Sequence, residues 1–475
     1  MRYHVLAADY DGTLATDGLV GQATLEALEQ LRASGRKLIL VTGRELGELK
    51  SVFPRTDLFE RVVAENGAVL YRPQTRQEVS LAQRPPDRFV EELRRRGVTG
   101  LSVGRVIVAT RTPHEVAVLK TIRDSGLELQ VIFNKGAVMV LPRGVNKATG
   151  LAAALEEMAI SPHNVVGVGD AENDQAFLAF CECSVAVANA LPVLKSQADL
   201  VTAAGHGAGV AELIGRLIAS DLVELEERLQ RHEILLGIGD NGREVRLRAY
   251  GANVLITGTS GGGTSTTAAG FLDRLLEKKY QFCLIDPEGD YLEFEDAVFL
   301  GGPERGPTVE EVIQALERPK QNTVVNLLGV KVDERPAYMD KLLPALARKR
   351  LHTGSPHWII VDEAHYLMPE FRAPAVRPIG ETQKGMMFIT AFPERMAREV
   401  LGAMDEVVVT GQSPHELVDR IRRLLDRVPP TIPPRPGEGE CDLLWPLRIG
   451  AAPFWYRRVP SKAIHRRHLR KYARG

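Results

Sequence analysis

The chain has 475 residues, of which 44% are hydrophobic, so it is long enough for about two or three domains with apolar cores. Its 60 basic and 61 acidic side chains give a formal net charge of −1, which provides no global attraction to nucleic acid or to acidic membranes. Four cysteines argue against a disulfide framework, and no apolar run approaches the ~18 residues of a membrane span. The chain begins directly in a strand pattern, so we expect no signal peptide and a cytoplasmic protein.

The first motif that carries chemistry follows an apolar, β-prone run at residues 3–8. The sequence DYDGT (residues 9–13) places two carboxylates, Asp9 and Asp11, at the end of a predicted buried parallel strand. Strand ends of this kind form the ligand-binding edge of an open α/β sheet, and Gly12 permits the sharp turn. A carboxylate at this position suits phosphoryl transfer through a covalent aspartyl-phosphate. The alternative is an acidic turn without a chemical role.

Further groups of matching chemistry follow apolar strands or begin a helix: Thr42 after residues 38–41, Lys147 at the start of a helix over 148–158, and Asp170 with Asp174 after residues 165–168. The two additional carboxylates suit a hard cation with oxygen ligands such as Mg²⁺. Because the carboxyl ends of parallel strands share one edge of a sheet, these groups are predicted to form a single site.

As a set, these motifs resemble the haloacid dehalogenase (HAD) superfamily, in particular its Cof-type (type IIB) phosphatases, over residues 1–220. The sequences ENGA (residues 65–68) and VAVANA (residues 185–190) are also typical of that branch. The resemblance implies an α/β Rossmann-like core and hydrolysis of a phosphorylated small molecule, with Asp9 as the nucleophile and Asp11 as the general acid and base. It further implies that Thr42 and Lys147 hold the phosphoryl oxygens. The implied Mg²⁺ site consists of Asp9, the backbone carbonyl of Asp11, Asp170 and Asp174, supported by Asn173.

Residues 79–144 interrupt this core, and their pattern predicts a small α+β cap. Helices are expected over 88–96 and 114–125 and a strand over 105–110, and the Asn-x-Gly turn at 134–136 indicates a hairpin. A cap excludes water and selects the leaving group. Because this insertion is short for the Cof branch, we expect a fairly open site.

The second half carries a different phosphate-binding pattern. An apolar strand at 253–257 runs into a glycine-rich turn and then a helix, so that backbone N–H groups and the helix dipole can face an anion. The Walker A pattern has a lysine where this chain has Thr264. Further along, the strand 358–361 ends in Asp362 and Glu363, the Walker B form, in which the aspartate orients Mg²⁺ and the glutamate polarises water.

Together with DPEGDY (residues 286–291), these segments resemble the HerA–FtsK superfamily of P-loop ATPases over residues 230–450. The resemblance implies a RecA-like P-loop NTPase domain that binds ATP through Gly258, Gly261, Gly263, Thr264, Ser265 and Asp362. Two departures make ATPase activity uncertain: the lysine is missing, and the strand 387–390 ends in Ala391, where relatives often have a glutamine. Loss of the lysine charge is expected to weaken nucleotide binding or turnover by on the order of several kcal/mol. Natural loss of the lysine and its deliberate replacement by Thr264 both remain open.

Ring ATPases of this superfamily place the active site between subunits, so the resemblance implies a homo-hexamer completed by a neighbour's arginine. The candidate residues are Arg372, Arg377, Arg395 and Arg398, each with simple surface solvation as the alternative. A Pro-rich stretch at 428–436 leads to a basic chain end. That end is either a solvated, partly helical tail or a surface that contacts nucleic acid or a neighbouring subunit.

The expected domains are a HAD core (1–78 and 145–220), the cap (79–144), a helix-like linker (221–248), a P-loop domain (249–427) and a Pro-rich connector with the basic segment (428–475). The favoured function is a Mg²⁺-dependent phosphatase that the P-loop domain assembles or regulates. The alternatives are a nucleic-acid translocase with an accessory phosphatase domain and an inactive relative that senses nucleotide.

Overall fold

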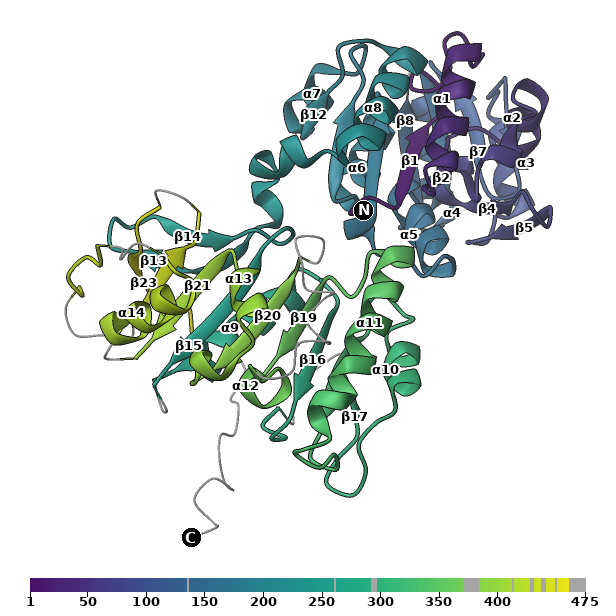
Figure 1. Cartoon of the computed structure of the whole chain (residues 1–475). Helices are drawn as coiled ribbons and strands as arrows, with labels where there is room; N and C mark the ends of the chain where they lie inside the picture. Colours follow the sequence, from purple (N-terminus) through teal and green to yellow (C-terminus); the bar gives the residue numbers. More distant parts are fainter. Residues whose placement is uncertain are drawn as a thin grey trace. The chain divides into compact units, whose positions relative to one another are not determined.

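The computed structural model describes residues 1–134, 136–259, 262–291, 297–370, 384–411, 414–427, 431–436, 441–448 and 451–460. The chain divides into two compact units, Met1–Leu229 and Gln230–Gly475, which are described separately (Figure 1). Within the described residues, no helix has both the length and the apolar character needed to cross a membrane.

The first unit is built on an eight-stranded sheet in the order β12-β11-β10-β1-β2-β3-β4-β5. Its strands are β1 (Val5–Asp9), β2 (Lys37–Val41), β3 (Arg61–Ala64), β4 (Val69–Arg72), β5 (Gln77–Ser80), β10 (Val165–Gly169), β11 (Cys183–Ala186) and β12 (Leu200–Val201). The strands from β12 to β3 are parallel, and β4 and β5 continue the sheet antiparallel. Every residue of β1 is buried, as expected for a parallel strand covered on both faces.

Helices connect the parallel strands: α1 (Gln22–Ala33), α2 (Leu46–Val52), α5 (Lys147–Glu157), α6 (Gln175–Phe180), α7 (Pro192–Gln197) and α8 (His206–Ser220). Short 3₁₀ turns η1 (Thr56–Leu58), η2 (Glu65–Gly67), η3 (Pro162–Asn164) and η4 (Glu172–Asp174) lie between them. The helix α1 packs against α8, and α5 packs against α6. This arrangement confirms the α/β Rossmann-like core that the sequence predicts for the first half.

The inserted cap consists of α3 (Asp87–Arg95), α4 (Glu115–Ser125) and the strands β6 (Ser102–Val103), β7 (Val108–Arg111), β8 (Leu129–Asn134) and β9 (Ala137–Pro142). These strands form an antiparallel sheet in the order β6-β7-β9-β8. The hairpin predicted around 134–136 is present as β8 and β9. Phe89, Leu93 and Val118 from the two helices pack with β7 and β9 in a small apolar core.

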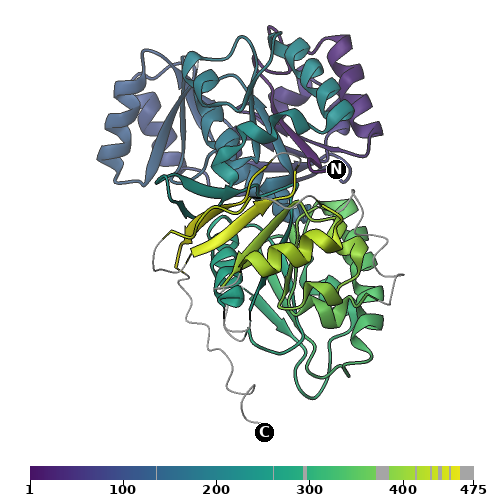
Figure 2. The ribbon, with the colours of Figure 1, turned by 60° about the vertical axis from the view of Figure 1, so that its left-hand side comes forward.

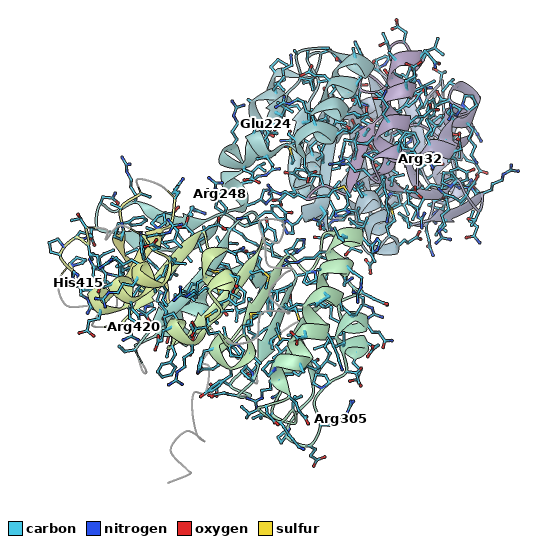
Figure 3. All side chains as sticks on the ribbon, in the orientation of Figure 1. Arg32, Glu224, Arg248, Arg305, His415 and Arg420 are labelled. Atoms are coloured by element: carbon cyan, nitrogen blue, oxygen red, sulfur yellow. The ribbon has the colours of Figure 1, made fainter. Side chains whose placement is uncertain are left out.

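The second unit contains an eleven-stranded sheet in the order β14-β13-β23-β22-β21-β15-β20-β19-β16-β18-β17. Its strands are β13 (Ile234–Gly239), β14 (Glu244–Leu247), β15 (Asn253–Gly258), β16 (Phe282–Asp286), β17 (Ala297–Leu300), β18 (Asn322–Asn326), β19 (Trp358–Val361), β20 (Met386–Thr390), β21 (Glu406–Thr410), β22 (Cys441–Pro446) and β23 (Phe454–Arg458). Its helices are α9 (Thr264–Glu277), α10 (Val309–Ala315), α11 (Arg335–Thr353), α12 (Ala364–Leu367), α13 (Arg398–Gly402) and α14 (Pro414–Leu424). Figure 3 labels Arg305, between β17 and α10, and Arg420 on α14 within this unit.

The segments that flank the central parallel strands of this unit differ from the sequence-based expectation. The residues expected to form a helix-like linker contain only the 3₁₀ turns η5 (Val223–Arg228) and η6 (Gln230–His232), followed by β13 and β14. The Pro-rich C-terminal region also contributes β22 and β23, and β23 pairs antiparallel with β13 (Figure 2). Because this pairing joins segments over 200 residues apart, local composition does not reveal it.

Candidate active site

The predicted catalytic residues of the first unit converge at the carboxyl edge of its sheet. Asp9 ends β1, Thr42 directly follows the neighbouring strand β2, and Asp170 follows β10 on the other side. Lys147 is the first residue of α5, whose start is fixed by a capping box: the side chain of Asn146 accepts the N–H of Thr149 at 3.0 Å. The strand register places Asp9, Thr42 and Asp170 at one edge of the sheet. The capping box begins α5 at Lys147, whose side chain reaches Asp9.

Lys147 links the two halves of the site. Its Nζ lies 2.5 Å from Oδ1 of Asp9 and 2.5 Å from Oδ1 of Asp174, and all three side chains are buried. Burial, together with the charge of Asp174, raises the pKa of Asp9 to about 7, while the ammonium of Lys147 acts in the opposite direction. Burial alone would lower the pKa of Lys147, but the carboxylates of Asp174 and Asp9 raise it above its ordinary value.

The donor set of the site fits a divalent cation. Carboxylate oxygens of Asp9, Asp170 and Asp174 lie within 4.8 Å of one another, and all three residues are buried. Three buried carboxylates against one lysine leave an excess of negative charge in a low-dielectric environment, which a cation offsets. A donor set made of oxygens alone is the kind that Mg²⁺ prefers. The residues present therefore fit the metal that the fold family implies.

Asp11 is held differently from Asp9. The guanidinium of Arg44 donates two parallel hydrogen bonds to its carboxylate, with Nε 2.7 Å from Oδ2 and Nη2 2.6 Å from Oδ1. Arg44 also donates to Glu48 at 2.7 Å, and the hydrogen bonds to Asp11 raise the pKa of the arginine. The side chain of Asp11 is 38% exposed, so it is far more accessible to solvent than that of Asp9.

The cap covers this edge of the sheet more closely than the sequence predicts. Asp9 and Lys147 are 4% and 1% exposed, and Met139 of the cap belongs to the same buried apolar cluster as the strands β1 and β2. The Sδ atom of Met139 and the Nδ2 atom of Asn173 lie 3.8 and 3.6 Å from the position of a Cβ at Gly43. Asp9 and Lys147 are therefore buried beneath a short insertion, whose length does not reveal how its sheet packs.

The ENGA segment contributes contacts to this site that the sequence did not reveal. Asn173 donates from Nδ2 to Oδ1 of Asn66 at 3.0 Å, which joins the turn η2 to the loop after β10. Both asparagines are buried. The sequence signal was an Asn-Gly pair directly after a buried strand, a pattern that favours left-handed backbone, but it does not indicate a partner.

In the second unit, the candidate nucleotide-binding residues lie at one sheet edge. The helix α9 begins at Thr264 directly after Gly263, whose φ is 101°, while Gly261 lies outside the described residues. Asp362 and Glu363 follow β19, which β20 alone separates from β15. Burial, and then the charge of Glu363, raises the pKa of Asp362 well above its usual range.

An arginine lies beside the glycine-rich turn of the second unit. The guanidinium of Arg458 lies beside Gly263 and donates to Asp442 at 2.9 Å, so an arginine charge that the sequence did not indicate sits next to the glycine-rich turn. Of the candidate arginine fingers, Arg395 and Arg398 are exposed, and Arg372 and Arg377 lie outside the described residues. The basic residues beyond 460 also lie outside them.

Comparison with known proteins identifies the first unit. A family model of haloacid dehalogenase-like hydrolases matches residues 6–103 and 102–214. Phosphoglycolate phosphatase of Methanothermobacter thermautotrophicus is 32% identical over 222 residues, which cover 45% of this chain and 98% of that protein. Phosphoglycolate phosphatase 2 of Saccharolobus solfataricus is 29% identical, with 46% and 93% covered. The crystal structure of a haloacid dehalogenase-like hydrolase from Bacteroides thetaiotaomicron aligns with 45% of this chain and 99% of its own, at 20% identity and a TM-score of 0.40.

The fold of the first unit is that of a hydrolase of the HAD class, with an α/β core of the Rossmann type. The chain belongs to the haloacid dehalogenase-like hydrolases through this unit, and its relatives support a phosphatase. These matches cover just under half of the chain.

Proposed function

We propose that the first unit is a Mg²⁺-dependent phosphatase that hydrolyses phosphomonoesters through an aspartyl-phosphate on Asp9. The observation that carries the proposal is the position of Lys147, whose ammonium contacts both Asp9 and Asp174 inside a buried carboxylate cluster. A lysine and three carboxylates this close together could serve as nucleophile, as cationic partner of the phosphoryl oxygens and as metal ligands, which supports the proposal.

In this mechanism a carboxylate oxygen of Asp9 attacks phosphorus and displaces the ester oxygen, which takes a proton from Asp11. Asp11 then accepts a proton from a water molecule that attacks the aspartyl-phosphate, so that phosphate leaves and Asp9 is restored. The hydroxyl of Thr42 and the ammonium of Lys147 hold the phosphoryl oxygens and offset their charge. Asp9, Asp170, Asp174 and the backbone carbonyl of Asp11 would hold Mg²⁺, which would offset further phosphoryl charge.

The pairing of Asp11 with Arg44 has a consequence for the first step. Both carboxylate oxygens of Asp11 accept hydrogen bonds from the guanidinium of Arg44, whereas a general acid must direct a carboxyl oxygen toward the leaving group. We therefore propose that Asp11 releases Arg44 when substrate is bound, and that Arg44 is then available to an anionic group of the substrate. A small phosphorylated carboxylic acid fits this requirement, and the named relatives are phosphoglycolate phosphatases.

The experiment is an assay of phosphate release from phosphoglycolate and p-nitrophenyl phosphate by the full chain. Turnover is expected with Mg²⁺ and is expected to vanish in EDTA and in Asp9→Asn, because the amide is not a nucleophile. Asp17→Asn is the matched control, since Asp17 is an exposed aspartate of the same loop with positive φ, which asparagine tolerates. Full activity of Asp9→Asn, or full activity in EDTA, would contradict the proposal.

For the second unit we propose a P-loop-like nucleotide site, in a RecA-like domain of the HerA–FtsK kind, that assembles or regulates the phosphatase. The supporting observation is that the glycine-rich turn after β15 and the acidic pair after β19 share one sheet edge, about 10 Å apart by strand spacing. Such a unit would form a ring, with a homo-hexamer as the expected state, or act on nucleic acid as a translocase. ATP binding is expected to be weak and to increase in Thr264→Lys, because that variant restores the missing charge. Absence of ATP binding in both the wild type and Thr264→Lys would show that the glycine-rich turn has only a structural role.

A further inference from the structure

The turn η2 holds three consecutive residues in the left-handed region of the backbone. The φ angles are 50° at Glu65, 54° at Asn66 and 103° at Gly67. Residues with a Cβ rarely adopt this conformation, so two of them in succession require surrounding contacts that hold them there. The backbone of the turn is tied to the catalytic loop after β2, because the N–H of Glu65 donates to the carbonyl of Arg44 at 2.9 Å and that of Asn66 to the carbonyl of Thr42 at 3.0 Å.

The side chain of Glu65 leaves this turn and binds the cap. Its carboxylate accepts three backbone N–H groups in succession: that of Arg105 at 2.9 Å, that of Val106 at 2.8 Å and that of Ile107 at 2.9 Å. Glu65 is only 2% exposed, so these bonds form away from bulk water. Hydrogen bonds from N–H groups to a charged acceptor are shorter and stronger than neutral ones.

A glycine makes this approach possible. An ideal Cβ at Gly104 would lie 2.7 Å from Oε1 and 2.8 Å from Oε2 of Glu65, closer than real Cβ atoms come. The backbone of the loop can therefore reach the carboxylate only because residue 104 has no side chain. The glutamate and the glycine, 39 positions apart in sequence, form one contact between core and cap.

The bound loop positions the part of the cap that faces the active site. It joins β6 to β7, and it is separate from the two chain connections between core and cap, residues 81–86 and 143–146. Val106 and Ile107 are buried in the same apolar cluster as β1. The strand β7 pairs with β9, which carries Met139 beside Gly43. Holding this loop therefore holds the sheet whose Met139 lies beside Gly43, the residue after Thr42.

We propose that Glu65 is a positioning residue that fixes the cap over the active site by binding the loop 104–107. It thereby sets the enclosure of the substrate and the size of the leaving group that the site accepts. The proposal rests on the phosphatase function of the first unit for its kinetic consequences, but the contact itself can be tested without any substrate.

The first experiment measures hydrogen exchange at the amides of residues 105–107 in the full chain. Exchange at these amides is expected to be at least about tenfold faster in Glu65→Ala than in the wild type, because their acceptor is gone. Gly104→Ala is expected to give the same result through steric exclusion of the carboxylate. Glu78→Gln is the matched control, since Glu78 pairs with the side chain of Arg105 in the same loop, at 2.7 Å. Equal exchange in Glu65→Ala and the wild type would overturn the proposal.

The second experiment separates positioning from stability. Glu65→Gln replaces the carboxylate by an amide of nearly the same shape and leaves the left-handed backbone at position 65 unchanged, so the fold is expected to survive. Phosphoglycolate is the small probe and p-nitrophenyl phosphate the large one. The kcat/KM for phosphoglycolate divided by that for p-nitrophenyl phosphate is expected to fall about tenfold in Glu65→Gln, mostly because KM for phosphoglycolate rises. A purely structural role would lower both values in equal proportion, and that result would contradict the proposal. A wild type that hydrolyses neither probe would refute the phosphatase function, while the exchange measurement would still decide the role of Glu65.

Discussion

The ammonium of Lys147 lies 2.5 Å from one carboxylate oxygen of Asp174, and the backbone N–H groups of Asp170 and Ala171 both donate to the other oxygen at 2.9 Å. Asp174 thus accepts hydrogen bonds on both oxygens and connects the lysine to the loop that carries Asp170. An ideal Cβ at Gly169 would lie 2.7 Å from this carboxylate, so the strand end is shaped around it. Asp174 therefore connects Lys147 to the loop of Asp170, and in the proposed mechanism it would orient both.

The first prediction concerns this orienting role. Asp174→Asn keeps an acceptor for the two N–H groups but removes the charge that faces Lys147, so kcat is expected to fall about 10²-fold. Glu172→Gln, an exposed change in the same loop, is expected to stay within about twofold of the wild type. Steady-state kinetics at saturating Mg²⁺ checks both. Unchanged turnover in Asp174→Asn would remove Asp174 from the mechanism.

The second prediction concerns Arg44 and the anionic group of the substrate. Arg44→Ala removes the guanidinium that contacts Asp11 in the free protein and is proposed to bind the substrate, and kcat/KM for phosphoglycolate is expected to fall about 10- to 100-fold because the substrate carboxylate loses its partner. Glu48→Gln removes only the exposed partner of Arg44 and is expected to change little. Equal kinetics for both variants would show that the guanidinium of Arg44 does not bind the substrate.

The strand-end groups could be predicted from the sequence, whereas their partners could not. Asp9, Thr42, Lys147 and Asp170 follow apolar strands or begin a helix, and parallel strand order then requires that they meet. The pairing of Asp11 with Arg44 depends on side-chain direction at two separate loops, which no local pattern encodes. The same holds for the contact of Glu65 with residues 105–107, and for β13 with β23, where partners distant in sequence decide the structure.

The third prediction concerns pH and the stability of the metal-free protein. The pKa of Asp9 is raised from 3.8 to about 7 in the folded chain, so this carboxyl stabilises the fold most below about pH 4, and that contribution is lost as pH rises through about 7. Asp9→Asn does not titrate. In EDTA, the melting temperature of Asp9→Asn is therefore expected to exceed that of the wild type more at pH 8 than at pH 5.

The measurement is the calorimetric transition of the first unit. All three tryptophans (Trp358, Trp445 and Trp455) lie beyond residue 229, so tryptophan emission follows the unfolding of the second unit alone. The calorimetric transition that does not coincide with the change in emission therefore belongs to the first unit. The same difference in melting temperature at both pH values would show that the carboxyl of Asp9 has its ordinary acidity in the fold.

The fourth prediction compares two helical glycines of the first unit. A Cβ at Gly150, on α5, would lie 2.5 Å from Cγ1 of Val63 and 2.6 Å from Cα of Gly67, so Gly150→Ala is expected to destabilise the unit by about 1–3 kcal/mol. A Cβ at Gly215, on α8, would meet no atom within 4 Å, and Gly215→Ala is expected to stabilise by up to ~1 kcal/mol through helix propensity. Calorimetry of the two variants checks the signs, and equal effects would contradict the packing of α5 against η2.

Detection of a covalent phosphoryl group on Asp9 is the most direct test of the proposed phosphatase mechanism. Asp11→Asn removes the base that activates water, while p-nitrophenyl phosphate has a leaving group that needs little help from an acid. With ³²P-labelled p-nitrophenyl phosphate and Mg²⁺, acid-quenched Asp11→Asn is expected to carry a hydroxylamine-sensitive label that peptide mapping places on Asp9. The double variant Asp9→Asn with Asp11→Asn is expected to carry none. Release of p-nitrophenol without any label on Asp9, or a label that survives in the double variant, would contradict the account.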